Sequence, residues 1–558
     1  MAQIVECVPN FSEGRNKNII QAITQEIEDT EGAVLLDVDP GFATNRTVVT
    51  FIGSPEAVKQ AAFRAIKKAA ELIDMSKHSG EHARMGATDV CPFVPVSGIS
   101  MKECVKLANE LGHRVGEELG IPVFLYEEAA KQPDRENLAN VRAGEYEGLQ
   151  EKLTDPHWQP DYGNSEFNTK SGATAIGARE FLIAYNVNLN TREKKLANEI
   201  ALNLREKGRL KRDDEGKIVR DDEGNALRME GRLKAVKGVG WYIEEYGQAQ
   251  ISYNLINFKT TRLHILFEES CKEAEKLGLR VTGSEIVGLI PLQALLEAGK
   301  YYLSKQGRST GVSDEELIHI AIKSLGLDDL GKFEPNNKII EYRFRSQYGE
   351  LAGLKIHEFV NELASESPAP GGGSVSALAG SLAAGLSSMV ANLTYGNKNY
   401  TDVWETMEPL AVKSQTLKSQ LVQAIDQDTD AFNNVMKARR LPKKTPEMQK
   451  MRDKAIEEAN QHATSIPFKV MELSLDVMKL CKIAANSGNP NAVSDAGVGA
   501  HMSFAAVNGA FLNVKINLPN INDDSYKKNI QDIALVILSE ALRLKNDILE
   551  TVNKKLES

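Results

Sequence analysis

Two histidines four residues apart are the first candidates for chemistry in this sequence. His78 and His82 lie with Glu81 in HSGEHARMGATD, and the 558 residues contain only 9 histidines. The spacing H-x-x-E-H is that of a zinc site on a helix. Glycines inside and just after the motif indicate a loop instead, which does not keep both rings on one face. We therefore favour a general-base histidine beside a carboxylate, with a purely structural histidine as the alternative and no metal expected.

A glycine-rich stretch, GNSEFNTKSGATAIGAR, is the second candidate. Its GATAIG is not followed by Lys-Ser/Thr, so the stretch is not a Walker A phosphate loop. Glycines let the backbone approach a flat ligand closely, and Arg179 could bind a carboxylate through two parallel hydrogen bonds. A tight entry into a buried strand is the alternative interpretation.

The last third of the chain offers a glycine-rich helix start and an aspartate cluster. In APGGGSVSALAG, Ser374 is a plausible N-cap, and the free N–H groups of such a start attract anions; a hinge is the alternative. In AIDQDTDAF, only Asp426 and Asp430 have the i,i+4 spacing of one helix face, so Asp428 points elsewhere. A buried carboxylate among the three would have the raised pKa of a general acid. The alternative is that all three aspartates are solvated and have no catalytic role.

A polar segment, SGNPNAVSDAGVGAH, lies between two predicted helices. We expect it to be a helix-linking loop, where Asn489 and Asp495 could bind a polar ligand. An ordinary capping turn is the competing interpretation.

Two architectures are expected to position these residues. Residues 1–326 alternate strands and helices in the order βαββαβ, followed by a second such round, which predicts two split-βαβ, ferredoxin-like subdomains. After that the strand pattern stops, and helical runs at 404–438, 448–483 and 524–556 predict an all-α bundle. The predicted boundaries are 1–180, 181–326, a linker at 327–340, and 341–558.

Composition narrows the class of protein. A formal net charge of -10 argues against a nucleic-acid or membrane-surface binder. The five cysteines form no CxxC pair, and the start lacks a signal-peptide pattern, so we expect a cytoplasmic protein. Residues 374–393 are long enough to span a bilayer but rich in Ser, Gly and Ala, which favours a closely packed bundle helix.

Taken together, the motifs resemble the bifunctional formimidoyltransferase-cyclodeaminase family over essentially the whole chain. The transferase half is carried by VPNFSEG, NRTVVT, HARMGATDVCPFVP, ATAIGAREFLIAYNVNLNT and GWYIEEYGQAQIS. The cyclodeaminase half is carried by PAPGGGSVSALAG, MVANLT, QDTDAFN, GNPNAVSDAGVGA and NVKINLP. Because these long motifs occur in the right order, the resemblance is specific.

The resemblance implies two consecutive reactions of histidine degradation. The formimidoyl group passes from N-formimidoyl-L-glutamate to N5 of tetrahydrofolate, and the product cyclises to 5,10-methenyltetrahydrofolate with loss of ammonia. By resemblance the transferase base is His82, and the cyclodeaminase acid/base is Asp428, with Asp426 as an alternative. No cofactor or metal beyond the tetrahydrofolate substrate is implied, and a homo-oligomer is expected.

The resemblance also marks substrate-binding positions. The folate stretch is Gly163, Asn164, Ser165, Glu166, Phe167, Asn168, Thr169, Lys170, Ser171 and Gly172. Further predicted contacts are Arg179, Gly372, Gly373, Ser374, Asn489 and Asp495. Folates often carry polyglutamate tails, so the basic run KARRLPKK predicts a tail-binding cluster of Lys437, Arg439, Arg440, Lys443 and Lys444, with a solvated helix end as the alternative.

Overall fold

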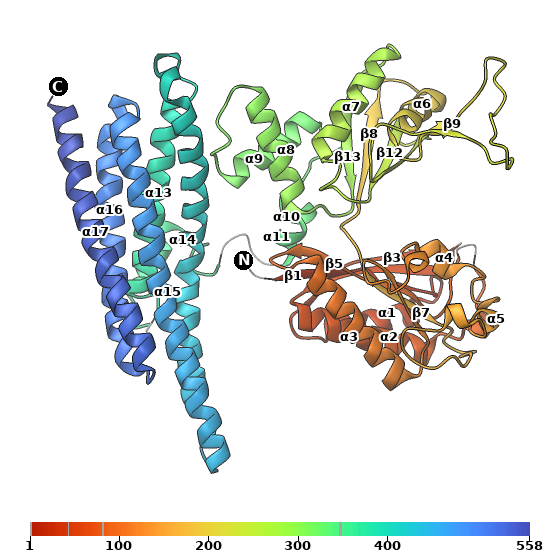
Figure 1. Cartoon of the computed structure of the whole chain (residues 1–558), viewed down its shortest axis with the longest axis horizontal. Coiled ribbons are helices and arrows are strands. Elements are labelled where there is room, and N and C mark those ends of the chain that lie inside the picture. Colours follow the sequence, from red (N-terminus) through yellow and green to blue (C-terminus); the bar gives the residue numbers. More distant parts are fainter. Residues whose placement is uncertain (1–2, 43, 81–82, 345–348, 368, 558) are drawn as a thin grey trace. The chain divides into compact units, whose positions relative to one another are not determined.

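A computed structural model describes residues 3–42, 44–80, 83–344, 349–367 and 369–557. The chain divides into two compact units (Figure 1). The first contains residues 1–294 and 325–344, and the second contains residues 295–324 and 345–558. An α/β unit is thus followed by an all-helical unit, which confirms the predicted fold class.

The first sheet has the strand order β3-β4-β1/β2-β5-β7-β6. Its first four positions are antiparallel, whereas β7 pairs in parallel with both β5 and β6. Strands β1 and β2 each pair with both β4 and β5, and together they form one interrupted strand between these two. The elements are β1 (Ile4–Cys7), β2 (Asn10–Phe11), α1 (Lys17–Glu28), β3 (Ala33–Gly41), β4 (Arg46–Gly53), α2 (Pro55–Leu72), β5 (Thr88–Ser97), α3 (Met101–Leu119), β6 (Val123–Glu127) and β7 (Thr174–Ala178).

The two faces of this sheet have separate cores. Because strand side chains alternate, Val123 and Leu125 of β6 join α1, α2 and α3 on one face. Phe124 and Tyr126 join a smaller core on the other face, beneath α4 (Leu138–Arg142) and α5 (Leu149–Lys152). Within the described residues this second core takes strand residues from β5, β6 and β7.

The second sheet repeats the first topology. Its strand order is β11-β12-β8-β13, all antiparallel, which matches the order β3-β4-β1-β5 of the first sheet. Both are the split-βαβ arrangement that the sequence predicts. The elements are β8 (Ile183–Leu189), α6 (Lys194–Leu204), β11 (Val236–Ile243), β12 (Gln248–Leu255), α7 (Leu263–Lys276) and β13 (Val281–Val287), and a short hairpin of β9 (Arg209–Leu210) with β10 (Arg228–Met229) lies between α6 and β11.

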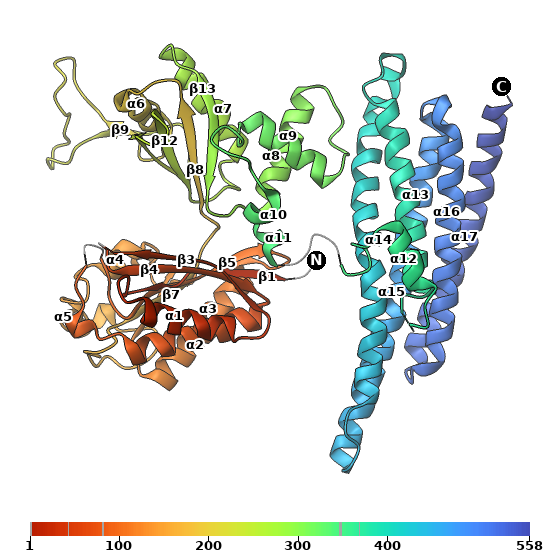
Figure 2. The ribbon, with the colours of Figure 1, turned by 180° about the vertical axis from the view of Figure 1, so that it is seen from behind.

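Five long helices form most of the second unit, seen from both sides in Figures 1 and 2. They are α13 (Gly372–Thr394), α14 (Trp404–Arg439), α15 (Pro446–Ser487), α16 (Val493–Asn517) and α17 (Asp524–Leu556). The paired ends of α14 and α15 project beyond the other helices in both views. Helix α9 (Asp314–Leu325) and the loop before it also pack here, where Thr310 Oγ1 donates to Glu408 at 2.6 Å.

Helix α13 is the one described helix whose length and hydropathy suit a membrane span, but 67% of its most apolar window is buried. The burial depends on small residues. A Cβ on Gly380 would lie 2.7 Å from Ser474 Oγ of α15, so only a glycine permits this approach. Small side chains let helices pack closely, as the sequence predicts for this segment.

Candidate functional sites

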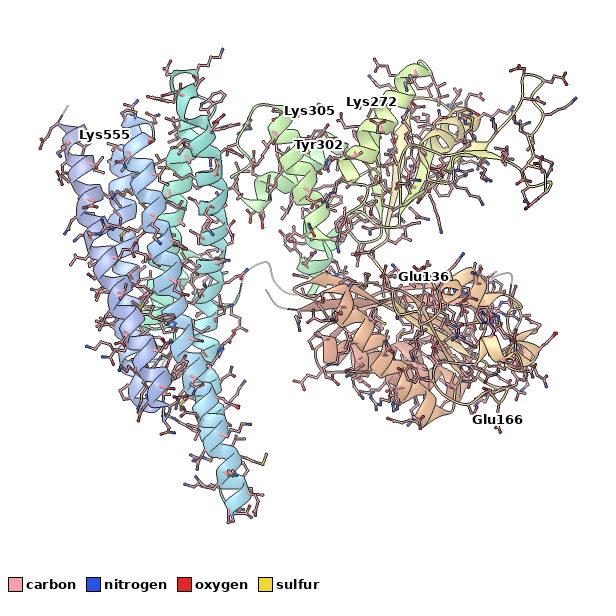
Figure 3. All side chains as sticks on the ribbon, viewed as in Figure 1. Glu136, Glu166, Lys272, Tyr302, Lys305 and Lys555 are labelled. Atoms are coloured by element: carbon pink, nitrogen blue, oxygen red, sulfur yellow. The ribbon has the colours of Figure 1, made fainter. Side chains whose placement is uncertain are left out.

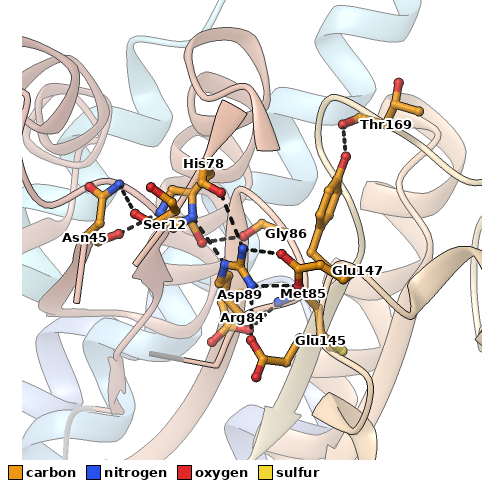
Figure 4. A network of polar contacts seen from close by, with 12 residues as sticks. Ser12, Asn45, His78, Arg84, Met85, Gly86, Asp89, Glu145, Glu147 and Thr169 are labelled. Atoms are coloured by element: carbon orange, nitrogen blue, oxygen red, sulfur yellow. Dashed lines mark hydrogen bonds and ion pairs between the residues drawn. The ribbon is translucent and has the colours of Figure 1, made fainter. Parts of the chain in front are cut away.

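Loops from distant parts of the chain meet at one end of the first sheet. Ser12 Oγ donates to the Gly86 carbonyl at 2.7 Å, and the Gly14 N–H donates to Asn45 Oδ1 at 3.0 Å. The Asn45 amide in turn donates to the carbonyl of Ser79 at 3.0 Å. These bonds join VPNFSEG, NRTVVT and HSGEHARMG into one polar network (Figure 4).

Both ring nitrogens of His78 make hydrogen bonds within this network. Its Nε2 lies 2.9 Å from the Asn45 carbonyl, and Arg84 Nε lies 3.3 Å from its Nδ1. Because a guanidinium can only donate, Nδ1 accepts and Nε2 carries the proton. Burial lowers the pKa of His78 from its ordinary value, so the ring is neutral near pH 7 and serves to hold the loop.

Arg84 and Asp89 hold the rest of the motif. Arg84 binds both carboxylate oxygens of Glu147 at 2.7 and 2.9 Å and contacts Glu145 at 3.0 Å. Asp89, fully buried, accepts from the Met85 N–H at 3.1 Å. A hollow of about 570 Å³ opens beside this network, lined by His78, Ser79, Gly80, Arg84, Gly144, Glu145 and Glu147.

His82, the predicted base, and Glu81 lie outside the described residues. The chain on either side of them is fixed. A Cβ on Gly80 would lie 2.2 Å from the Thr44 carbonyl, so only glycine fits there, and Arg84 is held by two glutamates. Among the described residues, no group of three or more His, Cys, Asp and Glu is placed to bind a metal ion.

One end of the predicted folate stretch lies against the same motif. Gly172 has a positive φ of 65°, and a Cβ there would lie 2.1 Å from the Met85 carbonyl. Nearby, the Tyr146 hydroxyl donates to the Thr169 carbonyl at 2.6 Å. The other end of the stretch packs against α3 at Gly163, and Glu166 is exposed at the surface (Figure 3). The later end of the stretch therefore lies against the motif, but none of its residues is among those that line the hollow.

Arg179 is not brought to this end of the sheet. It follows β7, whereas Gly172 precedes it, and the five residues of this strand, which lie between them, span roughly 16 Å. Arg179 acts instead on Glu6, whose pKa burial raises to about 7 although the arginine opposes this. Glu6 was not singled out in the sequence analysis, although a glutamate between the apolar residues of IVECVP indicates a buried carboxyl group.

Asp428, on α14, is half-buried. It lies against the start of α13, where a Cβ on Gly373 would be 2.1 Å from Asp428 Oδ1, so glycine makes room for the carboxylate. Ser374 Oγ lies 3.5 Å from Asp428 Oδ2. Burial raises the pKa of Asp428 from its ordinary value, and hydrogen bonds from Ser374 partly oppose the rise. A neutral acid can therefore persist here above the usual range.

The neighbouring aspartates have other surroundings. Asp426 accepts from the backbone N–H groups of Leu351 and Ala352 at 2.7 and 3.1 Å, and so holds a turn in place. Asp430 is exposed. Of the two candidates that the sequence could not separate, Asp428 alone sits in a setting that suits an acid.

Two local predictions on this unit are wrong. Ser374 is not the N-cap of α13, because Gly371 caps the helix and Ser374 lies buried inside it with its Oγ bonded to the Ile425 carbonyl at 2.8 Å. Asp495 lies in the first turn of α16 rather than in a loop. The glycines after it made the segment resemble a loop, but in the helix Gly497 lets Val552 of α17 approach closely.

Asn489 also lies far from Asp428. Its N–H donates to Thr394 Oγ1 at 2.8 Å, at the end of α13 opposite to Gly372. Twenty-three residues of helix put roughly 30 Å between the two ends. Asn489 and Asp495 therefore do not share one site with Asp428 within a single chain.

The predicted polyglutamate cluster lies at the projecting end of α14 and in the loop before α15. A hollow of about 580 Å³ along α14 lies between Asp428 and this end, lined by Asp430, Phe432, Asn433, Asn434, Met436, Lys437 and Arg440. The cluster residues Arg439, Lys443 and Lys444 are exposed. The cluster is thus continuous along the helix with the surroundings of Asp428.

These features define a two-part chain, with one candidate site on loops of an α/β unit and another between helices of a bundle. Three family models match in the same order: the formiminotransferase domain, N-terminal subdomain at 4–179, the formiminotransferase domain at 184–345, and formiminotransferase-cyclodeaminase at 355–534.

Named relatives cover the whole chain and each half. The chain is 45% identical to formimidoyltransferase-cyclodeaminase of Mus musculus over 97% of both chains. It is 43% identical to glutamate formimidoyltransferase of Streptococcus pyogenes, over 54% of this chain and 94% of that one. It is 37% identical to methenyltetrahydrofolate cyclohydrolase of Methylorubrum extorquens, over 36% of this chain and 97% of that one. The chain belongs to the formimidoyltransferase-cyclodeaminase family.

Proposed function

We propose that this chain transfers the formimidoyl group from N-formimidoyl-L-glutamate to N5 of tetrahydrofolate, and then cyclises 5-formimidoyltetrahydrofolate to 5,10-methenyltetrahydrofolate with release of ammonia. The observation that carries the proposal is the match of both halves, in order, to proteins named for both activities. The reactions belong to histidine degradation.

In the transferase step, His82 takes the proton from N5 as N5 bonds to the formimidoyl carbon. It then gives a proton to the glutamate nitrogen, whose bond to that carbon breaks. An imidazole with a pKa near ~6.5 can do both near neutral pH. Both ring nitrogens of His78 are hydrogen-bonded within the protein. This supports His82 in the role, because it is the histidine of the pair that is left for proton transfer.

In the cyclodeaminase step, N10 attacks the carbon carried by N5 and gives up its proton, while the imine nitrogen leaves as ammonia. A neutral carboxylic acid protonates that leaving nitrogen. Asp428 suits this role, because burial favours its protonated form and Ser374 orients it. Gly372 and Gly373 are proposed to bind substrate beside it, and Gly373 also makes room for the Asp428 carboxylate.

We assign the remaining features from sequence and resemblance. The proposed parts are 1–180 and 181–326 for the transferase, a linker at 327–340, and 341–558 for the cyclodeaminase. The protein works in the cytoplasm as a homo-oligomer, without metal or further cofactor, nucleic acid or membrane. A net charge of -10 supports the last two exclusions.

The basic cluster is proposed to bind a polyglutamate tail, so that the intermediate stays tethered between the two reactions. Exposed lysines and arginines next to the hollow on α14 support this role. The alternative is a solvated helix end.

One assay separates this proposal from its alternatives. Purified protein is mixed with N-formimidoyl-L-glutamate and tetrahydrofolate, and the absorbance of methenyltetrahydrofolate and the release of ammonia are followed. Both products support both activities. Formation of 5-formimidoyltetrahydrofolate alone would identify a transferase with an inactive helical half, and binding without turnover would identify a folate-binding scaffold.

A further inference from the structure

Two arginines from different segments share one buried carboxylate near the first site. Arg142, the last residue of α4, donates from Nη2 to Asp89 Oδ2 at 2.5 Å, and their side chains are 16% and 0% exposed. Arg46, the first residue of β4, is half-buried within the electrostatic influence of both. Two cations therefore lie within electrostatic range of a single buried anion.

The polar atoms of this cluster are not all satisfied. The Nε atoms of Arg46 and Arg142 are both buried without a hydrogen-bond partner. In the part of the chain that the structure describes, no hydrogen bond or ion pair involves the side chain of Arg46. A buried N–H without an acceptor costs free energy, and an anion bound beside these arginines would offset that cost.

Of the two substrates, the position of the cluster favours N-formimidoyl-L-glutamate over tetrahydrofolate. Arg46 follows directly after Asn45, which holds His78 and Ser79. Strand β4 is three positions from β7 in the order β4-β2-β5-β7, which corresponds to roughly 14 Å across the sheet. The predicted folate stretch ends at Gly172, just before β7. A ligand at Arg46 would therefore lie on the opposite side of the His78–Asp89 motif from the folate stretch.

We infer that Arg46 and Arg142 bind a carboxylate of N-formimidoyl-L-glutamate. The inference rests on the proposed transferase function and adds the residues that recognise its second substrate. A guanidinium binds a carboxylate through two parallel hydrogen bonds, and this substrate carries two carboxylates. The Nε atoms are closed off from solvent, so the donors for a ligand are the Nη atoms of Arg46, which make no hydrogen bond to the described residues.

The test is Arg46→Gln in the full-length chain. The KM for N-formimidoyl-L-glutamate should rise roughly 10- to 100-fold, as expected for a lost hydrogen bond to a charged group, while the KM for tetrahydrofolate changes less than about twofold. Tm should stay equal or rise, because the variant removes an uncompensated cation. Arg46→Lys, which keeps the charge, should fall between. Arg212→Gln, on the exposed β9–β10 hairpin, is the matched control and should behave as the parent.

Other outcomes overturn the inference. An unchanged KM for N-formimidoyl-L-glutamate would reject it, and so would a rise confined to tetrahydrofolate, which would assign the arginines to a folate carboxylate. A fall in Tm with unaltered kinetics would mark Arg46 as structural. If the parent protein transfers no formimidoyl group, the proposed function itself fails. Calorimetry with L-glutamate then tests the arginines alone, since the parent should bind it and Arg46→Gln should not.

Discussion

The site in the α/β unit and the site in the helical bundle are assembled in different ways. The first depends on loops that are far apart in sequence and are held by side-chain contacts to backbone, such as those of Asn45 and Ser12. The second depends on one helix end, where Gly373 makes room for Asp428 on the neighbouring helix. A single substitution is therefore expected to disable one site and spare the other.

The largest effect is expected from His82→Gln. Loss of a general base lowers a rate by about 100- to 10,000-fold, so formimidoyl transfer should fall by at least about 100-fold. Cyclisation of supplied 5-formimidoyltetrahydrofolate should stay within about twofold of the parent. Both rates are measured by absorbance on the same preparation, and an equal loss of both would end the separation of the two sites.

Asp428→Asn and Asp426→Asn form a matched pair within one helix. The first should lower cyclisation at least about 100-fold because the acid is lost. The second should destabilise the fold by about 1–3 kcal/mol, because an amide cannot accept from both N–H groups, with cyclisation retained per folded molecule. Kinetics and denaturant unfolding of both variants check this, and the reverse pattern would exchange the two roles.

The raised pKa of Asp428 also predicts a pH dependence of stability. A carboxyl with a raised pKa stabilises the folded state below its ordinary pKa, and this contribution is lost as the pH rises through the folded value. Asp428→Asn, which cannot ionise, should therefore gain stability relative to the parent between about pH 4 and pH 7. Parallel stability curves for the two proteins across that range would show that the carboxyl is not buried.

His78→Ala is expected to have a moderate effect confined to the first unit. Removing the ring breaks its bonds to Asn45 and Arg84, at a cost of about 1–3 kcal/mol. Because burial lowers the pKa of His78, its contribution is present above about pH 6.5 and is lost as the pH falls through the lowered value. Unfolding curves of parent and variant should converge in acid, and a variant that instead loses more stability in acid would contradict the neutral ring.

The smallest effect is expected at the projecting end of α14. Neutral replacements at the five residues of the basic cluster should raise the KM for pentaglutamylated substrate by about three- to tenfold and leave that for the monoglutamate nearly unchanged, because exposed ion pairs contribute little each. Steady-state kinetics with the two folates measure this. Equal changes for both would leave the cluster as a solvated helix end.

Elements were easier to predict from the sequence than their contacts. Apolar periodicity predicts the long helices to within a few residues, and the order of strands and helices predicts both split-βαβ sheets. The choice between Asp426 and Asp428 depended on Leu351 and Gly373, which lie more than fifty residues away in sequence. Spacing within one helix carries no information about such partners.

The same limit explains what the sequence analysis missed in the first site. Arg46 and Arg142, 96 residues apart in the sequence, lie within electrostatic range of each other, and glycines 80 and 172 matter because of carbonyl groups that approach them from other loops. Glycine-rich segments can be ligand loops, turns or close helix contacts, and DAGVGA proved to be the last of these. Only the three-dimensional neighbours distinguish the cases.

The most direct test of two separate sites is a mixing experiment with His82→Gln and Asp428→Asn. Each variant alone, given N-formimidoyl-L-glutamate and tetrahydrofolate, should form almost no methenyltetrahydrofolate, and Asp428→Asn should accumulate 5-formimidoyltetrahydrofolate. An equimolar mixture should restore the absorbance of the product after a lag. A mixture that stays inactive while Asp428→Asn accumulates no intermediate would contradict the account.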